Sequence, residues 1–97
     1  MPQQYLITAY DFTDAEALDR RLQVRPHHLE LAKKMKAEGK ILIGGAMLNP
    51  EGKMIGSTLV MEFENEDEIQ AWLAHEPYVL GKVWDKVDVK PFKVAQL

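Results

Sequence analysis

The sequence contains no cysteine among its 97 residues. This absence excludes disulfide bonds, thiolate nucleophiles and zinc sites built from cysteine, and it is typical of proteins in a reducing compartment. An excess of positive charge is also missing, because twelve Lys and Arg residues face fifteen Asp and Glu residues and the net charge is −3. Nucleic acid is therefore not expected as a partner, since such binding depends on neutralising phosphates.

Long hydrophobic runs are absent as well. No segment is apolar enough to span a bilayer, and the N-terminal Met-Pro-Gln-Gln lacks a basic region followed by an apolar stretch. We therefore expect a cytoplasmic protein with no membrane partner. The chain has the length of one domain, and 46% of its residues are hydrophobic, so residues 1–97 are predicted to form a single domain around one core.

Sequence motifs for cofactors and metals are missing too. The six glycines form neither a Gly-x-Gly-x-x-Gly motif nor a phosphate-binding loop, so no nucleotide cofactor is expected. No His-x-x-x-His or Asp-x-Asp spacing occurs, and we expect no bound metal. Any chemistry must then come from the side chains of the protein itself.

Apolar runs separated by turn residues predict the element order strand, helix, strand, strand, helix, strand. The first helix is expected from about residue 15 to Gly39, with an interruption at Arg25 and Pro26. The second helix follows the capping residue Asn65 and stops before Pro77. This order predicts an α+β, ferredoxin-like βαββαβ fold with an antiparallel sheet. The strands are expected at residues 4–11, 41–48, 55–63 and 84–94.

Three of the predicted strands are apolar on both faces. These strands contain Tyr5-Leu6-Ile7, Ile41-Leu42-Ile43 and Leu59-Val60-Met61. A sheet with helices on one face and water on the other should alternate apolar and polar residues. Because right-handed crossovers place both helices on the same face, the opposite face needs another cover, most simply a second copy of the chain. We therefore expect a homodimer that associates through the sheet face; the alternative is that strand propensity alone explains these residues.

Helical periodicity separates two adjacent histidines. His28 shares a face with Leu31 and Met35, whereas His27 shares a face with Glu30. We expect His28 to point inward and His27 to face solvent. Partial burial and the start of a helical segment nearby would favour a neutral imidazole at position 28, which could act as a base. The alternative is an ordinary core histidine hydrogen-bonded to a backbone carbonyl.

Two acidic residues are candidates for partners of His28. Glu76 continues the apolar stripe of the second helix, so its carboxylate should be partly desolvated and should need a donor such as an inward imidazole. The alternative is a frayed helix end that leaves Glu76 in water. Asp11 ends the first strand, where it could be a helix cap or a carboxylate of the pocket.

Ser57 and the Gly44-Gly45 pair could line the same pocket. Glycine inside a strand commonly marks a bulge or a close approach of backbone. Ser57 follows Gly56 at the start of the third strand, and no Gly-x-Ser-x-Gly elbow surrounds it. We expect Ser57 to be a polar part of the pocket wall rather than a nucleophile.

Four ordered motifs resemble those of the YciI-like (YCII-related) family. Arg25-Pro26-His27-His28-Leu29 resembles its Arg-Pro-x-His-Leu, and Gly56-Ser57-Thr58 resembles its Gly-Ser-Thr at a strand opening. Glu76-Pro77-Tyr78-Val79 resembles Asp-Pro-Tyr-Val, and Val89-Lys90-Pro91-Phe92-Lys93 resembles Val-Lys-Pro-Phe-Lys. Several motifs in order over nearly the whole chain are more specific than any one of them.

The resemblance implies a dimeric α/β barrel whose pocket holds a histidine and an acidic residue as an active-site dyad. The histidine corresponds to His28. The acidic residue corresponds to Glu76, where the family pattern has aspartate, or to Asp11, which matches an aspartate after the first strand of family sequences. Four further residues are expected to surround this dyad and to contact the substrate, namely Arg25, Ser57, Gly45 and Tyr78.

These observations predict a small-molecule enzyme of lyase or isomerase type that needs no cofactor. His28 would act as the general base, and the substrate would be anionic or ring-bearing. The resemblance suggests this reaction class, because one relative acts in the elimination of chloride from a hydroxylated aromatic. The alternative hypothesis is a non-catalytic ligand-binding or accessory protein that uses the same pocket, since a fold alone does not determine chemistry.

Overall fold

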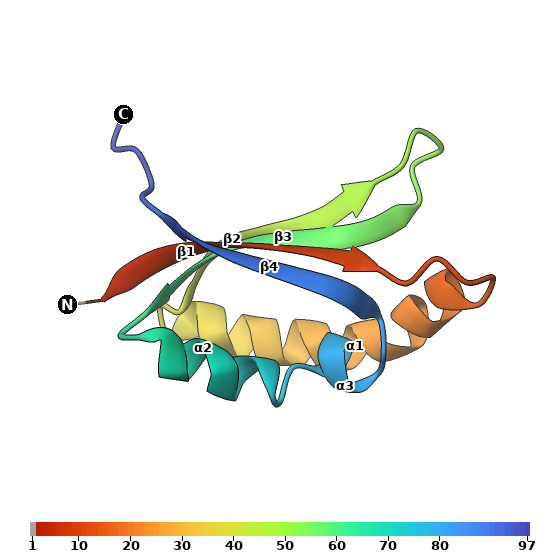
Figure 1. The fold of residues 1–97 in the computed structure, drawn as a ribbon, viewed down its shortest axis with the longest axis horizontal. Helices are drawn as coiled ribbons and strands as arrows, with labels where there is room; N and C mark the ends of the chain where they lie inside the picture. Colours follow the sequence, from red (N-terminus) through yellow and green to blue (C-terminus); the bar gives the residue numbers. More distant parts are fainter. Residues whose placement is uncertain (1) are drawn as a thin grey trace.

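The computed structural model describes residues 2–97, which form a four-stranded sheet with helices packed on one face (Figure 1). The strands lie side by side in the order β2-β3-β1-β4, and every neighbouring pair is antiparallel. This topology confirms the predicted α+β, ferredoxin-like fold. In chain order the elements are β1 (Gln3–Asp11), α1 (Ala17–Ala37), β2 (Ile41–Leu48), β3 (Met54–Phe63), α2 (Glu66–Leu73), α3 (Pro77–Leu80) and β4 (Trp84–Phe92).

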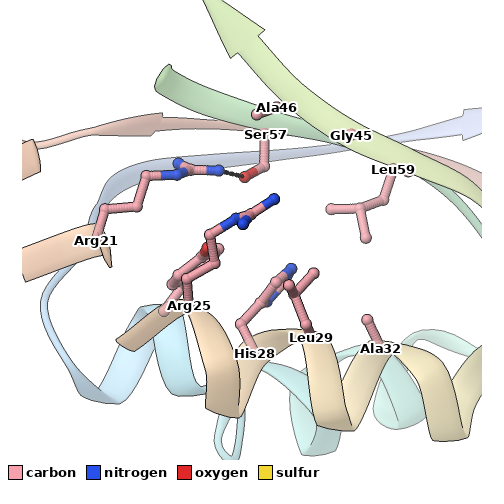
Figure 2. Close-up of a pocket in the computed structure, with 11 residues that line it drawn as sticks. Arg21, Arg25, His28, Leu29, Ala32, Gly45, Ala46, Ser57 and Leu59 are labelled. Atoms are coloured by element: carbon pink, nitrogen blue, oxygen red, sulfur yellow. Dashed lines mark hydrogen bonds between the residues drawn. The ribbon is translucent and has the colours of Figure 1, made fainter. Parts of the chain in front are cut away.

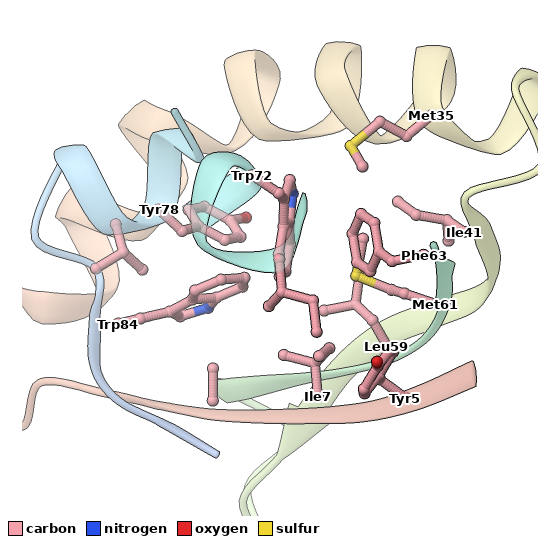
Figure 3. Packing of buried hydrophobic residues seen from close by; sticks show 13 residues of the cluster. Tyr5, Ile7, Met35, Ile41, Leu59, Met61, Phe63, Trp72, Tyr78 and Trp84 are labelled. Atoms are coloured by element: carbon pink, nitrogen blue, oxygen red, sulfur yellow. The ribbon is translucent and has the colours of Figure 1, made fainter. Parts of the chain in front are cut away.

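The hydrophobic core lies between the sheet and the helices (Figure 3). Alternate residues of the two central strands point toward the helices, and among them Ile7 and Met61 are fully buried. Aromatic side chains fill the space between these strands and the helices. The Trp84 ring lies edge-on to Tyr78 and to Trp72, with ring centres 5.5 and 6.1 Å apart. These large rigid groups form the floor on which the site residues rest.

Helix α1 is continuous, so the expected interruption at Arg25 and Pro26 is wrong. Proline inside a helix removes one backbone hydrogen bond and costs about 3 kcal/mol. Packing of the buried face offsets this cost, and that face carries Arg21, His28 and Met35 at intervals of one heptad. Because the helix begins at Ala17, His28 lies in its middle, and the expected influence of a helix start on this imidazole is also wrong.

The second helical region consists of two short helices. Helix α2 follows the predicted cap at Asn65 and ends at Leu73, whereas Pro77 begins a separate helix, α3, which was not predicted. Glu76 is the N-terminal cap of α3, because its carboxylate accepts a hydrogen bond from the backbone N–H of Tyr78 at 3.0 Å. Glu76 is 2% exposed, so the alternative of a frayed end in water is wrong.

The face of the sheet away from the helices is uncovered by the residues that the structure describes (Figure 1). Leu6 and Val60 pair across β1 and β3 with their side chains on this face. Ile43, which pairs with Val60 from β2, is 67% exposed, and Tyr10 is 52% exposed. The helices therefore cover a single face, as predicted. No helix within residues 2–97 combines the length and apolarity needed to cross a membrane.

Candidate active site

A pocket of about 220 Å³ lies between α1 and the strands β2 and β3 (Figure 2). Arg25 and His28 point into it from α1, toward Ser57 on β3. Gly45 contributes to the wall from β2, and Tyr78 contributes from α3. The structure thus brings together five of the residues that were predicted from the sequence to form a site.

The His28 ring is hydrogen-bonded to the Glu76 carboxylate. Its Nδ1 atom lies 2.6 Å from Oε1 of Glu76, the same oxygen that caps α3. A carboxylate can only accept, so this contact places the proton of a neutral ring on Nδ1 and leaves Nε2 as an acceptor. Nε2 has no hydrogen-bond partner within residues 2–97, and the ring lines the pocket. The geometry favours Glu76 over Asp11 as the acid beside His28, although the family pattern has aspartate at position 76.

Two aromatic rings hold the imidazole in one orientation. The His28 ring stacks on Tyr78 with centres 3.9 Å apart and planes inclined by 13°. Trp84 contacts the same ring edge-on, with centres 5.9 Å apart. Because both rings are buried, His28 has little freedom to turn, and its free nitrogen stays directed at the pocket.

Asp11 is paired with Arg21 and not with His28. Nη1 of Arg21 lies 2.9 Å from both carboxylate oxygens of Asp11, and the two side chains are 3% and 5% exposed. Burial raises the pKa of the Asp11 carboxyl, and the hydrogen bond from Arg21 opposes this rise. Arg21 was not among the site residues predicted from the sequence. Its signal was available, because Arg21 lies seven residues before His28 and so shares its helix face.

Arg21 also connects this ion pair to the pocket. Nη2 of Arg21 donates to Oγ of Ser57 at 2.8 Å, and Nε1 of Trp84 donates to the same oxygen at 3.2 Å. The guanidinium lies 4.7 Å from the centre of the Tyr78 ring. Burial raises the pKa of the Tyr78 hydroxyl above its ordinary value, so Tyr78 stays neutral at physiological pH.

Arg25 supplies a cation at the solvent side of the pocket. Its side chain is exposed and forms no ion pair with any residue that the structure describes. Leu29 and Leu59 give the remaining wall an apolar character. Within residues 2–97 no cluster of three or more His, Asp or Glu side chains is placed to hold a metal ion. The pocket thus combines a base, a free cation and an apolar wall, a set suited to moving a proton on a small anion or ring.

Comparison with known proteins gives consistent matches over almost the entire chain. Residues 3–93 match the YCII-related domain. Protein YciI of Escherichia coli O6:H1 (strain CFT073) is 41% identical over 95 residues, which cover 92% of this chain and 95% of that protein.

Solved structures of similar fold include proteins with and without a named activity. The 5-chloro-2-hydroxyhydroquinone dehydrochlorinase of Burkholderia phenoliruptrix AC1100, in complex with 2,5-dihydroxybenzoquinone, is 27% identical with a TM-score of 0.81, covering 95% of each chain. A dimeric ferredoxin-like protein from an uncultured marine organism is 17% identical with a TM-score of 0.58, covering 100% of this chain and 99% of its own.

Proposed function

The chain belongs to the YCII-related domain family, and from this premise we propose that it is a cofactor-independent enzyme of lyase or isomerase type acting on a small molecule. The observation that carries the proposal is the His28 imidazole, whose Nδ1 is bonded to Glu76 while Nε2 is directed at the pocket. A positioned general base of this kind contributes roughly a hundredfold to ten-thousandfold to a rate.

In this reaction Nε2 of His28 accepts a proton from the substrate. Glu76 keeps the other proton on Nδ1 and stabilises the imidazolium that forms, because it is a buried carboxylate at 2.6 Å. An isomerase would return the proton to another substrate atom. A lyase would use the electron pair released from the broken bond to hydrogen to expel a leaving group such as chloride.

The proposed substrate is a small oxygenated ring or anion. A volume of about 220 Å³ suits a compact molecule, and Leu29 and Leu59 provide an apolar wall for a ring. Arg25 provides a positive charge at the solvent side for an anionic group. The dehydrochlorinase with 2,5-dihydroxybenzoquinone bound supports this class, because it is a relative that holds an oxygenated ring.

Turnover of a panel of hydroxylated aromatics, quinones, lactones and carboxylic acids tests the proposal. We expect His28→Ala to lower kcat/KM by roughly a hundredfold to ten-thousandfold on the substrate that wild type turns over. His27→Ala is the matched control, because His27 is exposed and adjacent, and it should retain activity. Full activity in His28→Ala would refute the role of the imidazole. Ligands that raise the melting temperature without turnover would instead favour the accessory, ligand-binding alternative.

We also propose that two copies of the chain pair through the uncovered face of the sheet. The apolar residues on that face support this arrangement, as do structural neighbours described as dimeric. Light scattering at micromolar concentration should give twice the mass of the chain. Leu6→Glu should produce monomers, while Leu80→Glu, a change at a 64% exposed residue on α3, should not. A monomeric wild-type protein would refute the pairing.

A further inference from the structure

Ser57 receives two hydrogen bonds and gives none to the described residues. Its Oγ lies 2.8 Å from Nη2 of Arg21 and 3.2 Å from Nε1 of Trp84. Guanidinium and indole N–H groups can only donate, whereas a hydroxyl has two lone pairs and one proton. Both lone pairs of Ser57 are therefore occupied. No acceptor for the hydroxyl proton is found among residues 2–97.

From this arrangement we infer that the Ser57 hydroxyl donates its proton to a ligand oxygen that carries or develops negative charge. The fourth tetrahedral direction around Oγ is the one left free, and Ser57 lines the pocket opposite Arg25 and His28 (Figure 2). The inference rests on the proposed function in taking this pocket as the ligand site. It assigns Ser57 the role of an oxyanion donor.

Asp11 and Arg21 act on the ligand through Ser57. The guanidinium is charged and the Arg21 side chain is buried, so its hydrogen bond to Oγ is strong and polarises the O–H group toward donation. The ion pair with Asp11 holds the guanidinium in place before any ligand arrives. A donor that is oriented in advance loses no energy to reorganisation when charge develops on the ligand. We therefore classify Asp11 and Arg21 as positioning residues.

The same contacts argue against Ser57 as a nucleophile. A nucleophilic serine needs a base that accepts its proton, as in a serine, histidine and acid triad. His28 and Glu76 could suggest such a triad, but no hydrogen bond joins Ser57 to His28 within residues 2–97. A positively charged donor on Oγ also withdraws electron density from the oxygen. Ser57 is thus equipped to donate and poorly equipped to attack.

This role narrows the substrate class. A base at His28 and a donor at Ser57 together suit a molecule in which loss of a proton places negative charge on a conjugated oxygen. Phenols, hydroxyquinones and enolisable carbonyl compounds have this property. Simple alkyl halides and saturated alcohols do not.

Binding of 4-nitrophenol tests the donor role of Ser57. The phenolate form is yellow and the neutral form is not, so absorbance shows which form is bound and how tightly. We expect Ser57→Ala to weaken phenolate binding by roughly tenfold to a hundredfold, the effect of a hydrogen bond to a charged group. Binding of nitrobenzene, which has no phenolic oxygen, should change little. Ser57→Thr keeps a hydroxyl at this position, so it should bind the phenolate more tightly than Ser57→Ala and close to wild type. Thr13→Ala removes an exposed hydroxyl outside the pocket and should behave as wild type.

Unchanged phenolate affinity in Ser57→Ala would overturn the inference, as would a wild-type protein that does not bind 4-nitrophenolate. A second measurement needs no variant. Wild type treated with diisopropyl fluorophosphate should show no adduct at Ser57 by mass spectrometry, and an adduct there would also overturn it. These binding tests involve no turnover, so they can fail while His28→Ala still abolishes activity, and they can succeed in a protein that proves to be no enzyme.

Discussion

The buried ion pair of Asp11 and Arg21 allows a quantitative test of how much this contact contributes to the stability of the fold. Their side chains are 5% and 3% exposed, so removing one partner leaves the other as an uncompensated charge in the protein interior. We expect Asp11→Leu to lower the free energy of unfolding by about 3–5 kcal/mol. That loss is a large fraction of the roughly 5–15 kcal/mol that stabilises a typical protein.

Removing both partners should cost much less than the sum of the single changes. Desolvation of two charges cancels much of their attraction, and the raised pKa of Asp11 shows that burial disfavours its charged form. The double variant Asp11→Leu/Arg21→Met should lie within about 2 kcal/mol of wild type. Arg21→Met should also cost about 3–5 kcal/mol, so the cycle gives a coupling energy of at least about 4 kcal/mol.

Urea unfolding at one fixed protein concentration measures all four members of the cycle. The pH dependence adds a check of sign. In Arg21→Met the pKa of Asp11 should rise further, because the guanidinium that opposes the effect of burial is gone. The destabilisation caused by the buried, charged carboxylate is then present above that pKa, and it is relieved as the pH falls through that pKa. Arg21→Met should therefore recover stability toward acid, whereas Asp11→Leu should not. Single variants that each cost less than about 1 kcal/mol, with no coupling, would refute the reasoning.

Two further predictions concern a close backbone approach and an exposed ion pair. In Gly56→Ala the new Cβ would clash with the backbone oxygen of Ala9. We therefore expect the free energy of unfolding to fall by about 1–3 kcal/mol, as measured by thermal unfolding. Gly45→Ala, whose Cβ would meet nothing within 4 Å, is the control and should be nearly neutral. The hydrogen bond from Arg20 lowers the pKa of Asp14 from its ordinary 3.8 to about 2. The Asp14 carboxylate therefore contributes to folding stability above pH 3.8, and this contribution is lost as the pH falls through about 2. NMR titration should find this pKa, and Arg20→Gln should return it toward 3.8.

The local pattern of the sequence was sufficient for the elements and for the direction of single side chains. Strand alternation and turn residues predicted the strands of the sheet to within two residues of their observed ends. Helical periodicity predicted that His28 faces inward and His27 outward, as the burial of the two residues confirms. Such predictions succeed because the direction of a side chain depends on positions only three or four residues away.

Local rules failed where packing across elements outweighed them. Proline is expected to interrupt a helix, yet Pro26 lies inside α1, because the buried face of that helix packs along its length against the sheet and the other helices. The separate helix α3 was missed because it is a single turn, and its cap depends on a carboxylate that packing turns inward.

The sequence by itself determined the order of the four strands and the two longer helices, the sheet with helices on one face, and the candidate histidine. Only the tertiary structure decided which charges meet: Glu76 with His28 across two helices, and Arg21 with Asp11 and Ser57 across a helix and two strands. The reason is physical. These partners are separated by up to 48 residues along the chain, and a contact over such a separation exists only once the register of the strands and the packing of the helices have set the distance between them.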